Sequence, residues 1–176
     1  MTLTTKLNQT IRTIPNFPKE GIMFKDITPV LRDVDLCREI AKGLADQFRD
    51  KRVDVVAGIE SRGFLFGMLV AQELGCAFSI IRKKGKLPHK TVEVEYALEY
   101  GSAIIEMHED EIKPDQHVMI HDDLLATGGT ADAAAQLIKQ VGGVIAGFSF
   151  VIELDALGGR ERLAVHSDRI IGLVNY

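Results

Sequence analysis

The stretch HVMIHDDLLATGGTADAAAQLI, residues 117–138, decides how the rest of the chain can be arranged. Its short apolar run, Val118 to Ile120, lies between turn signals and predicts a buried strand. The glycines at 128 and 129 end that strand. A helical period then returns from residue 131 to 141 in Ala134, Leu137, Ile138 and Val141. The predicted order is strand, acidic pair, glycine loop, helix.

The start of this helix is a candidate phosphate site. The first amide groups of a helix are unpaired, and glycines before it let a ligand approach the backbone closely. Asp122 and Asp123 cannot bind that phosphate, but they suit hydroxyls or a bound cation beside it. A ribose 5-phosphate fits both requirements. The alternative is an ordinary strand-to-helix turn with two solvated aspartates.

No other common nucleotide loop is present. The sequence contains no Gly-x-x-x-x-Gly-Lys-Ser/Thr, and no Gly-x-Gly-x-x-Gly follows a predicted strand. ATP-hydrolysing and dinucleotide-binding functions are therefore disfavoured.

Composition indicates one soluble, cytoplasmic domain. The chain has 176 residues, 46% hydrophobic and 26% charged, with a net charge of -4. This acidity argues against nucleic acid as a partner, so an anionic substrate needs a local basic cluster. Cys37 and Cys76 are too few for a disulfide framework and are expected to be reduced. No secretion signal and no apolar run of the ~20 residues that a membrane helix needs are found.

Hydrophobic periodicity predicts an α/β fold. Helices are expected at 4–11, 36–48 and 64–74, core strands at 53–58, 77–81, 144–152 and 170–174, and two antiparallel strands at 91–96 and 103–107. Residues 15–29, rich in proline, are expected to form a cap or lid, and 153–160 a loop. Alternating strands and helices favour a parallel sheet covered on both faces.

Ligands of such sheets bind beyond the carboxyl ends of the strands. Residues 58–62, 82–86, 122–130 and 153–157 all follow predicted strands, so these loops should gather at one edge. Residues 82–90 hold five of the 21 basic residues. Alone, this run is typical of a solvated loop; beside a phosphate loop in an acidic protein, it suits a second, more highly charged phosphate group.

Asp122 to Thr130 resembles the phosphoribosyl diphosphate (PRPP) motif of the type I phosphoribosyltransferases. Four further segments resemble the adenine phosphoribosyltransferase family, in the right order: FPKEGIMFKDITP (17–29), ESRGF (60–64), IRKKGKLP (81–88) and LEYG (98–101). The resemblance implies the type I phosphoribosyltransferase fold, a mainly parallel twisted sheet flanked by helices in a single domain, 1–176. It also implies a small hood at about 1–34, a core at about 35–176 and a flexible β-hairpin loop at about 83–107.

The implied reaction transfers ribose 5-phosphate from PRPP to adenine, giving AMP and pyrophosphate, in a homodimer. The implied 5-phosphate site is Ala126, Thr127, Gly128, Gly129 and Thr130. The implied pyrophosphate site, where the substrate itself carries Mg2+ without direct protein ligands, is Glu60, Ser61, Arg62, Arg82, Lys83, Lys86 and His89, with a cis Glu60–Ser61 peptide. The implied adenine site is Met23, Phe24, Lys25 and Leu154. The implied catalytic residues are Asp122 and Asp123, at the ribose hydroxyls and the developing positive charge, and Glu99, the general acid or base at the purine.

One residue departs from the family pattern. His121 stands where an aliphatic residue is expected, and its position beside Asp122 predicts an altered pH response. His117 lies about 13 Å away along an extended strand, too far to share a metal ion with it.

Two alternative functions stay open from the residues alone. One is a PRPP-sensing regulator without catalysis, and the other is an enzyme that takes hypoxanthine, guanine or xanthine.

Overall fold

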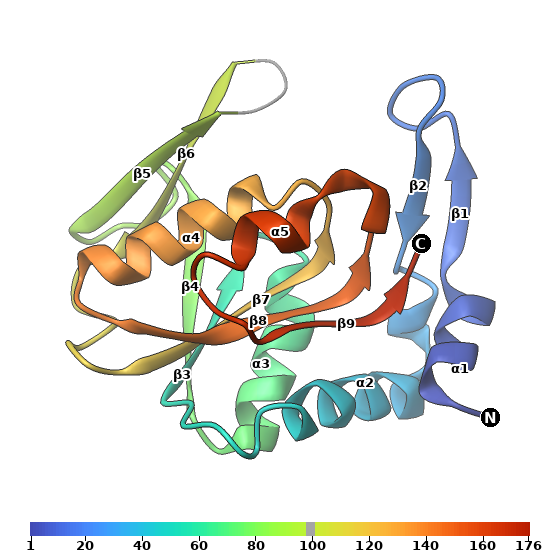
Figure 1. The fold of residues 1–176 in the computed structure, drawn as a ribbon, viewed down its shortest axis with the longest axis horizontal. Helices are drawn as coiled ribbons and strands as arrows, with labels where there is room; N and C mark the ends of the chain where they lie inside the picture. Colours follow the sequence, from blue (N-terminus) through green and yellow to red (C-terminus); the bar gives the residue numbers. More distant parts are fainter. Residues whose placement is uncertain (98–100) are drawn as a thin grey trace.

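The central sheet sets the positions of all the predicted loops. In the part of the chain that the computed structural model describes, residues 1–97 and 101–176, seven strands form a sheet in the order β5-β6-β4-β3-β7-β8-β9 (Figure 1). The strands β3 (Val55–Ile59), β4 (Ala77–Lys83), β7 (His117–Leu125), β8 (Val144–Glu153) and β9 (Ile170–Asn175) are parallel. Beyond β4, β6 (Ser102–His108) and β5 (Thr91–Ala97) continue the sheet antiparallel. The predicted α/β architecture is confirmed.

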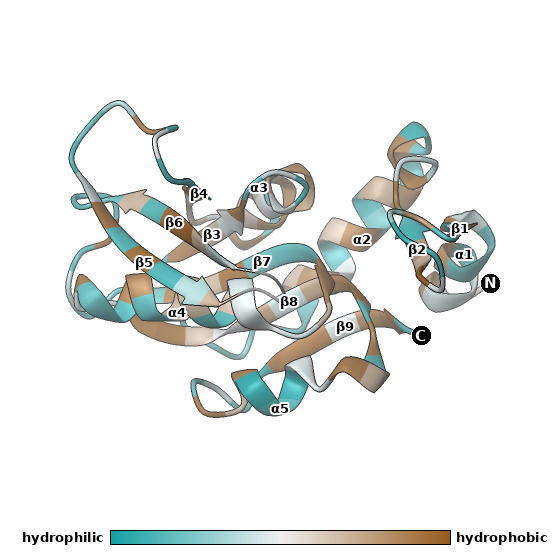
Figure 2. Cartoon of the chain, turned by 90° about the horizontal axis from the view of Figure 1, so that it is seen from above, coloured by the Kyte–Doolittle hydropathy of each residue, from teal (hydrophilic) through white to brown (hydrophobic). Residues whose placement is uncertain are grey.

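Helices cover both faces of the sheet. One face packs on α4 (Gly129–Gln140), and the other packs on α2 (Val34–Asp46) and α3 (Gly63–Leu74), with α1 (Leu3–Thr10) beside α2. Along β7, Val118 and Ile120 join the first core and Met119 the second. The run Val118 to Ile120 is apolar because its successive side chains enter opposite cores. In Figure 2, brown (hydrophobic) residues predominate along β8 and β9, whereas hydrophobic and hydrophilic colours alternate along β5 and β6.

The N-terminal cap is more regular than expected. β1 (Arg12–Pro15) and β2 (Met23–Asp26) pair antiparallel, and the Phe17–Pro18 peptide between them is cis. Asn16 holds the connection, since its side-chain oxygen accepts a hydrogen bond of 2.9 Å from the Gly21 amide. Strands this short, separated by prolines, carry too little alternation to be recognised in the sequence. A 3-10 turn, η1 (Val30–Arg32), then leads to Asp33, which caps α2 by accepting a hydrogen bond of 3.0 Å from the Leu36 amide.

Two predictions about the strand ends are wrong. β7 runs to Leu125, so Asp122 and Asp123 lie within the strand and not on a tip beyond it, because pairing with β8 continues to Leu125 opposite Glu153. The expected loop 153–160 contains η2 (Asp155–Leu157) and the start of α5 (Gly159–Leu163). A helix of five residues is too short to show a helical period in sequence.

The helices of the fold are short or amphipathic. Within the described residues, no helix combines the length and apolar character needed to span a membrane. The boundaries expected for hood, core and flexible loop stay predictions.

Candidate active site

The four predicted loops meet at one edge of the sheet. β3 lies between β4 and β7, β7 pairs with β8, and all four strands run in the same direction. The segments that follow them therefore emerge side by side (Figure 1). Because adjacent parallel strands end at the same edge, the predicted convergence is confirmed.

The glycine loop turns the end of β7 into α4. Gly128 adopts the left-handed conformation (φ 77°) as the residue before α4, where a side chain would be strained. A side chain there would also approach the Gly159 carbonyl oxygen at 3.0 Å. The loop residues 126–130 line a cavity of about 90 Å³ together with Asp122. The unpaired amide groups at the start of α4 make this cavity suited to an anion.

The two carboxylates of β7 have different surroundings. Asp123 is buried, and its Oδ2 lies 2.5 Å from Nε of Arg62. Burial alone would lower the pKa of Arg62, but the hydrogen bond and charge of Asp123 raise it. Burial and the neighbouring charge of Asp123 raise the pKa of Asp122 well above its usual range. The pair thus combines a carboxylate neutralised by arginine with one that resists ionisation.

The turn after β3 packs tightly on β7. The Glu60–Ser61 peptide is cis, as the resemblance implies. At Gly63, a Cβ atom would lie 2.7 Å from the His121 carbonyl oxygen and 3.1 Å from Oδ1 of Asp122. Glycine at this position therefore lets the turn carrying Arg62 approach the acidic pair.

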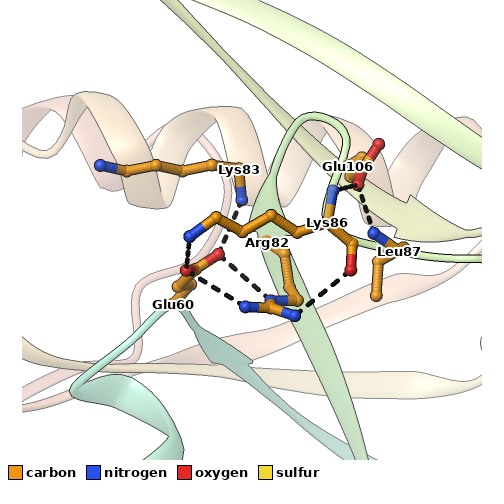
Figure 3. A network of polar contacts seen from close by, with 6 residues as sticks. All are labelled: Glu60, Arg82, Lys83, Lys86, Leu87 and Glu106. Atoms are coloured by element: carbon orange, nitrogen blue, oxygen red, sulfur yellow. Dashed lines mark hydrogen bonds and ion pairs between the residues drawn. The ribbon is translucent and has the colours of Figure 1, made fainter.

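Glu60 gathers basic residues at the end of β4 and in the loop after it (Figure 3). Its carboxylate lies 2.6 Å from Nζ of Lys86 and 3.2 Å from Nε of Arg82, and it accepts a hydrogen bond of 3.0 Å from the Lys83 amide. Burial raises the pKa of Glu60, but the bonds from Lys86, Lys83 and Arg82 outweigh burial and lower it to about 2. One carboxylate faces two basic side chains, those of Arg82 and Lys86, so the cluster keeps a net positive charge that suits an anion.

A cavity connects this cluster with the acidic pair. It measures about 230 Å³ and is lined by Glu60, Ser61, Arg62, Lys83, Asp122 and Asp123. Six of the residues predicted from separate loops thus share one space.

The His89 ring packs against another histidine. Among the contacts of the described residues, its ring packs against His108 at 5.9 Å and does not join the Glu60 network. The run that holds His89 continues into β5, so sequence proximity to Lys86 does not bring it to the same place.

The predicted adenine residues lie on β2 and after β8. Phe24 meets the ring of Phe17 edge-on at 5.1 Å and faces the Arg62 guanidinium at 5.9 Å. Nζ of Lys25 lies 3.6 Å above the Tyr176 ring. Phe24 and Arg62 therefore connect the hood to the acidic pair.

Leu154 is held at the end of β8. Its amide donates a hydrogen bond of 2.9 Å to the Leu125 carbonyl, and its side chain packs on the core. Glu153 anchors the following segment through Arg160, with Oε1 at 2.8 Å from Nε and Oε2 at 2.5 Å from Nη2. Asp26 likewise holds its own loop, since its carboxylate accepts a hydrogen bond of 2.9 Å from the Thr28 amide.

His121 lies on the face of β7 opposite Asp122, and its ring bonds to β8. Its ring is fully buried, and Nδ1 lies 2.8 Å from Oγ of Ser149. Burial lowers the pKa of His121 to about 4, so the ring is neutral near pH 7. This contradicts the expectation that His121 alters the pH response near neutrality.

The predicted catalytic residue Glu99 lies outside the described residues. The strand before it is attached to the glycine loop, since the Tyr96 hydroxyl lies 3.2 Å from Oγ1 of Thr130. The sequence alone favours Tyr96 as a surface or packing residue. Its position at the end of an alternating strand, three residues before Glu99, is the sequence signal that could have indicated a contact with the site.

Comparison with known proteins gives one consistent result. Residues 25–166 match the family model described as the phosphoribosyl transferase domain. An adenine phosphoribosyltransferase of Cytophaga hutchinsonii is 52% identical over 170 residues, which cover 97% of this chain and 94% of that protein.

Solved structures that resemble this chain are also adenine phosphoribosyltransferases. The crystal structure of adenine phosphoribosyltransferase from Thermoanaerobacter pseudethanolicus has a TM-score of 0.95 and 44% identity, and the match covers 99% of this chain and 100% of that one. The Saccharomyces cerevisiae enzyme, complexed with adenine and an imino-altritol bisphosphate, has a TM-score of 0.90 and 37% identity, with 97% and 98% covered.

Proposed function

This chain belongs to the adenine phosphoribosyltransferases, within the phosphoribosyl transferase family, and we propose that its four loops divide the substrates of that reaction between them. The reaction moves ribose 5-phosphate from PRPP to adenine, releases pyrophosphate and yields AMP, a step of purine salvage. The observation that carries the division is the shared edge, where a phosphate cradle, an acidic pair and a basic cluster meet.

The glycine loop binds the 5-phosphate in this proposal, and the acidic pair binds the ribose. Residues 126–130 offer amide groups at the start of α4, while Asp122 and Asp123 accept from hydroxyls. Positive charge grows on the ribosyl group as its bond to pyrophosphate breaks, as in glycoside cleavage. Burial and the charge of Asp123 raise the pKa of Asp122, and a positive charge growing beside it would favour its ionised form.

The basic cluster binds the pyrophosphate. Arg62, Arg82, Lys83 and Lys86 supply donors, and charge-assisted bonds to phosphate oxygens are strong. In the free protein Asp123 and Glu60 hold three of these cations, so pyrophosphate competes with two internal carboxylates.

Mg2+ fits this site through oxygen ligands. The cavity is lined by carboxylate oxygens and by basic side chains. Mg2+ is usually bound by diphosphate oxygens together with one or two carboxylates. We therefore propose that Mg2+ would be carried by the PRPP diphosphate, which would enter the cavity lined by Asp122 and Asp123. When bound, it offsets the charge that accumulates on the leaving pyrophosphate.

The hood and the end of β8 bind adenine. Phe24 supplies an aromatic face and Leu154 an apolar one, while the backbone of Met23 and Lys25 in β2 reads the purine edge. A carbonyl acceptor facing the exocyclic amine selects adenine over 6-oxopurines, since it offers no proton of its own. Glu99 carries the proton at the purine.

Assembly and location are part of the proposal. Leu65 and Met68 of α3 are 43% and 46% exposed, and apolar residues on one helix favour a homodimer through this face. The free Cys37 and Cys76 are consistent with a reducing cytoplasm.

One assay tests the function. The purified protein is mixed with PRPP, Mg2+ and adenine, hypoxanthine, guanine or xanthine, and nucleotide and pyrophosphate are measured. We expect AMP and pyrophosphate with adenine alone. PRPP binding without product from any purine would indicate a regulator, and turnover of a 6-oxopurine would contradict the proposed adenine site.

A further inference from the structure

Glu106 is a buried carboxylate that belongs to none of the proposed binding sites. It lies on β6, opposite Arg82 of β4 and Glu93 of β5. Its neighbours Ile105 and Met107 enter the core that includes α4, so Glu106 points to the other face of the sheet. There its residue exposure is only 3%. The segment that covers it is the basic loop after β4.

The carboxylate binds the backbone of that loop. Its Oε1 accepts hydrogen bonds of 2.9 Å from the amides of both Lys86 and Leu87 (Figure 3). Burial raises the pKa of Glu106, but the amides of Gly85, Leu87 and Lys86 outweigh burial and lower it. Glu106 is therefore ionised at neutral pH.

Fixing this backbone also fixes two cations. Lys86 extends its side chain to Glu60 at 2.6 Å, and its carbonyl accepts a bond of 3.3 Å from Nη1 of Arg82. Both cations belong to the proposed pyrophosphate cluster. A shift of the Lys86 backbone would displace one directly and remove a partner of the other.

We propose that Glu106 is a positioning residue for the reaction, which holds residues 85–87 so that Lys86 and Arg82 face the pyrophosphate end of PRPP. This inference rests on the proposed function. It gives the lone acid of the apolar run Ile104-Ile105-Glu106-Met107 a role that core packing cannot explain. An apolar side chain of similar size would leave two amides that now bond to Oε1 without an acceptor under the loop.

The test compares Glu106→Met with Glu106→Gln. The Met variant loses the acceptor, and we expect KM for PRPP and the dissociation constant of Mg2+-pyrophosphate to rise on the order of tenfold, with KM for adenine unchanged. Because one oxygen accepts both bonds, Glu106→Gln keeps them and should restore both constants to within about threefold of wild type. Glu93→Met is the matched control, since Glu93 contacts the same loop through a side chain, Nζ of Lys84 at 2.7 Å, and not through the amides that Glu106 binds.

A merely structural role predicts another pattern. Loss of folded protein lowers kcat and leaves both KM values and pyrophosphate affinity unchanged, and that result would overturn the proposal, as would equal effects of Glu93→Met and Glu106→Met. In a Lys86→Ala background, Glu106→Met should weaken pyrophosphate binding by much less than tenfold. A full tenfold effect there would contradict positioning of Lys86.

The inference stays testable if Glu106→Met does not fold and if the proposed function fails. If Glu106→Met does not fold, Glu106→Asp, one methylene shorter, should weaken Mg2+-pyrophosphate binding more than Glu106→Gln does; the reverse order would refute the inference. Calorimetry with pyrophosphate does not depend on adenine chemistry. Wild type that binds pyrophosphate but makes no AMP would therefore reject the proposed function and leave the positioning test intact.

Discussion

The Glu60 network predicts a measurable dependence of stability on pH. The pKa of Glu60 is lowered from 4.5 to about 2, and its side chain is only 10% exposed. A lowered carboxyl pKa stabilises the fold above the ordinary value, and this stabilisation is lost as pH falls toward the folded value. At 1.36 kcal/mol per pKa unit, the full contribution is about 3 kcal/mol at neutral pH.

The variant Glu60→Gln removes the titration and isolates this contribution. The free energy of unfolding is measured with urea for both proteins at about pH 7 and about pH 3.5. With the two pKa values above, the gap between wild type and variant should shrink by roughly 1.4 kcal/mol at the lower pH. In a Lys86→Met background the shrinkage should be smaller, because Lys86 makes the largest lowering contribution to this pKa. A gap equal at both pH values would refute the reasoning.

Two further substitutions test the surroundings of the site. His121→Val removes a buried ring whose pKa is lowered to about 4. The unfolding free energy of wild type should therefore fall by about 2 kcal/mol more than that of the variant between about pH 7 and about pH 5. The pH profile of kcat near neutrality should be the same in both proteins, and a shifted profile would show that the ring acts on the carboxylates. Gly159→Ala places a Cβ against the Ala126 carbonyl and 2.8 Å from Cδ1 of Leu125, so unfolding assays should show a loss of about 1–3 kcal/mol. Steady-state kinetics should show a higher KM for PRPP and an unchanged KM for adenine; an unchanged KM for PRPP would mean that α5 does not support the phosphate loop.

Local patterns predict those parts of the site that one segment builds. The strand, glycine turn and helix of residues 117–138 follow from period and turn chemistry within one stretch. The convergence of four loops follows from the rule that parallel strands end at one edge. Neither needs the position of any side chain.

Contacts between distant segments are not predictable in this way. Arg62 and Asp123 are 61 residues apart, and their ion pair depends on the close approach of Gly63 to β7. Glu106 shows the same limit. Its acidity is visible in sequence, but the register of β6 against β4 decides that the basic loop covers it. The sequence does not predict the short α5 or the β1–β2 pair, because neither is long enough to show a period.

The division of PRPP between two loops is the central claim, and amide hydrogen exchange tests it most directly. Mg2+-pyrophosphate should slow exchange in residues 82–87 and leave 126–130 unchanged, while ribose 5-phosphate should slow exchange in 126–130 and leave 82–87 unchanged. Each ligand thus reports on its own loop. Protection of the same loop by both ligands, or of neither loop by either, would contradict the account.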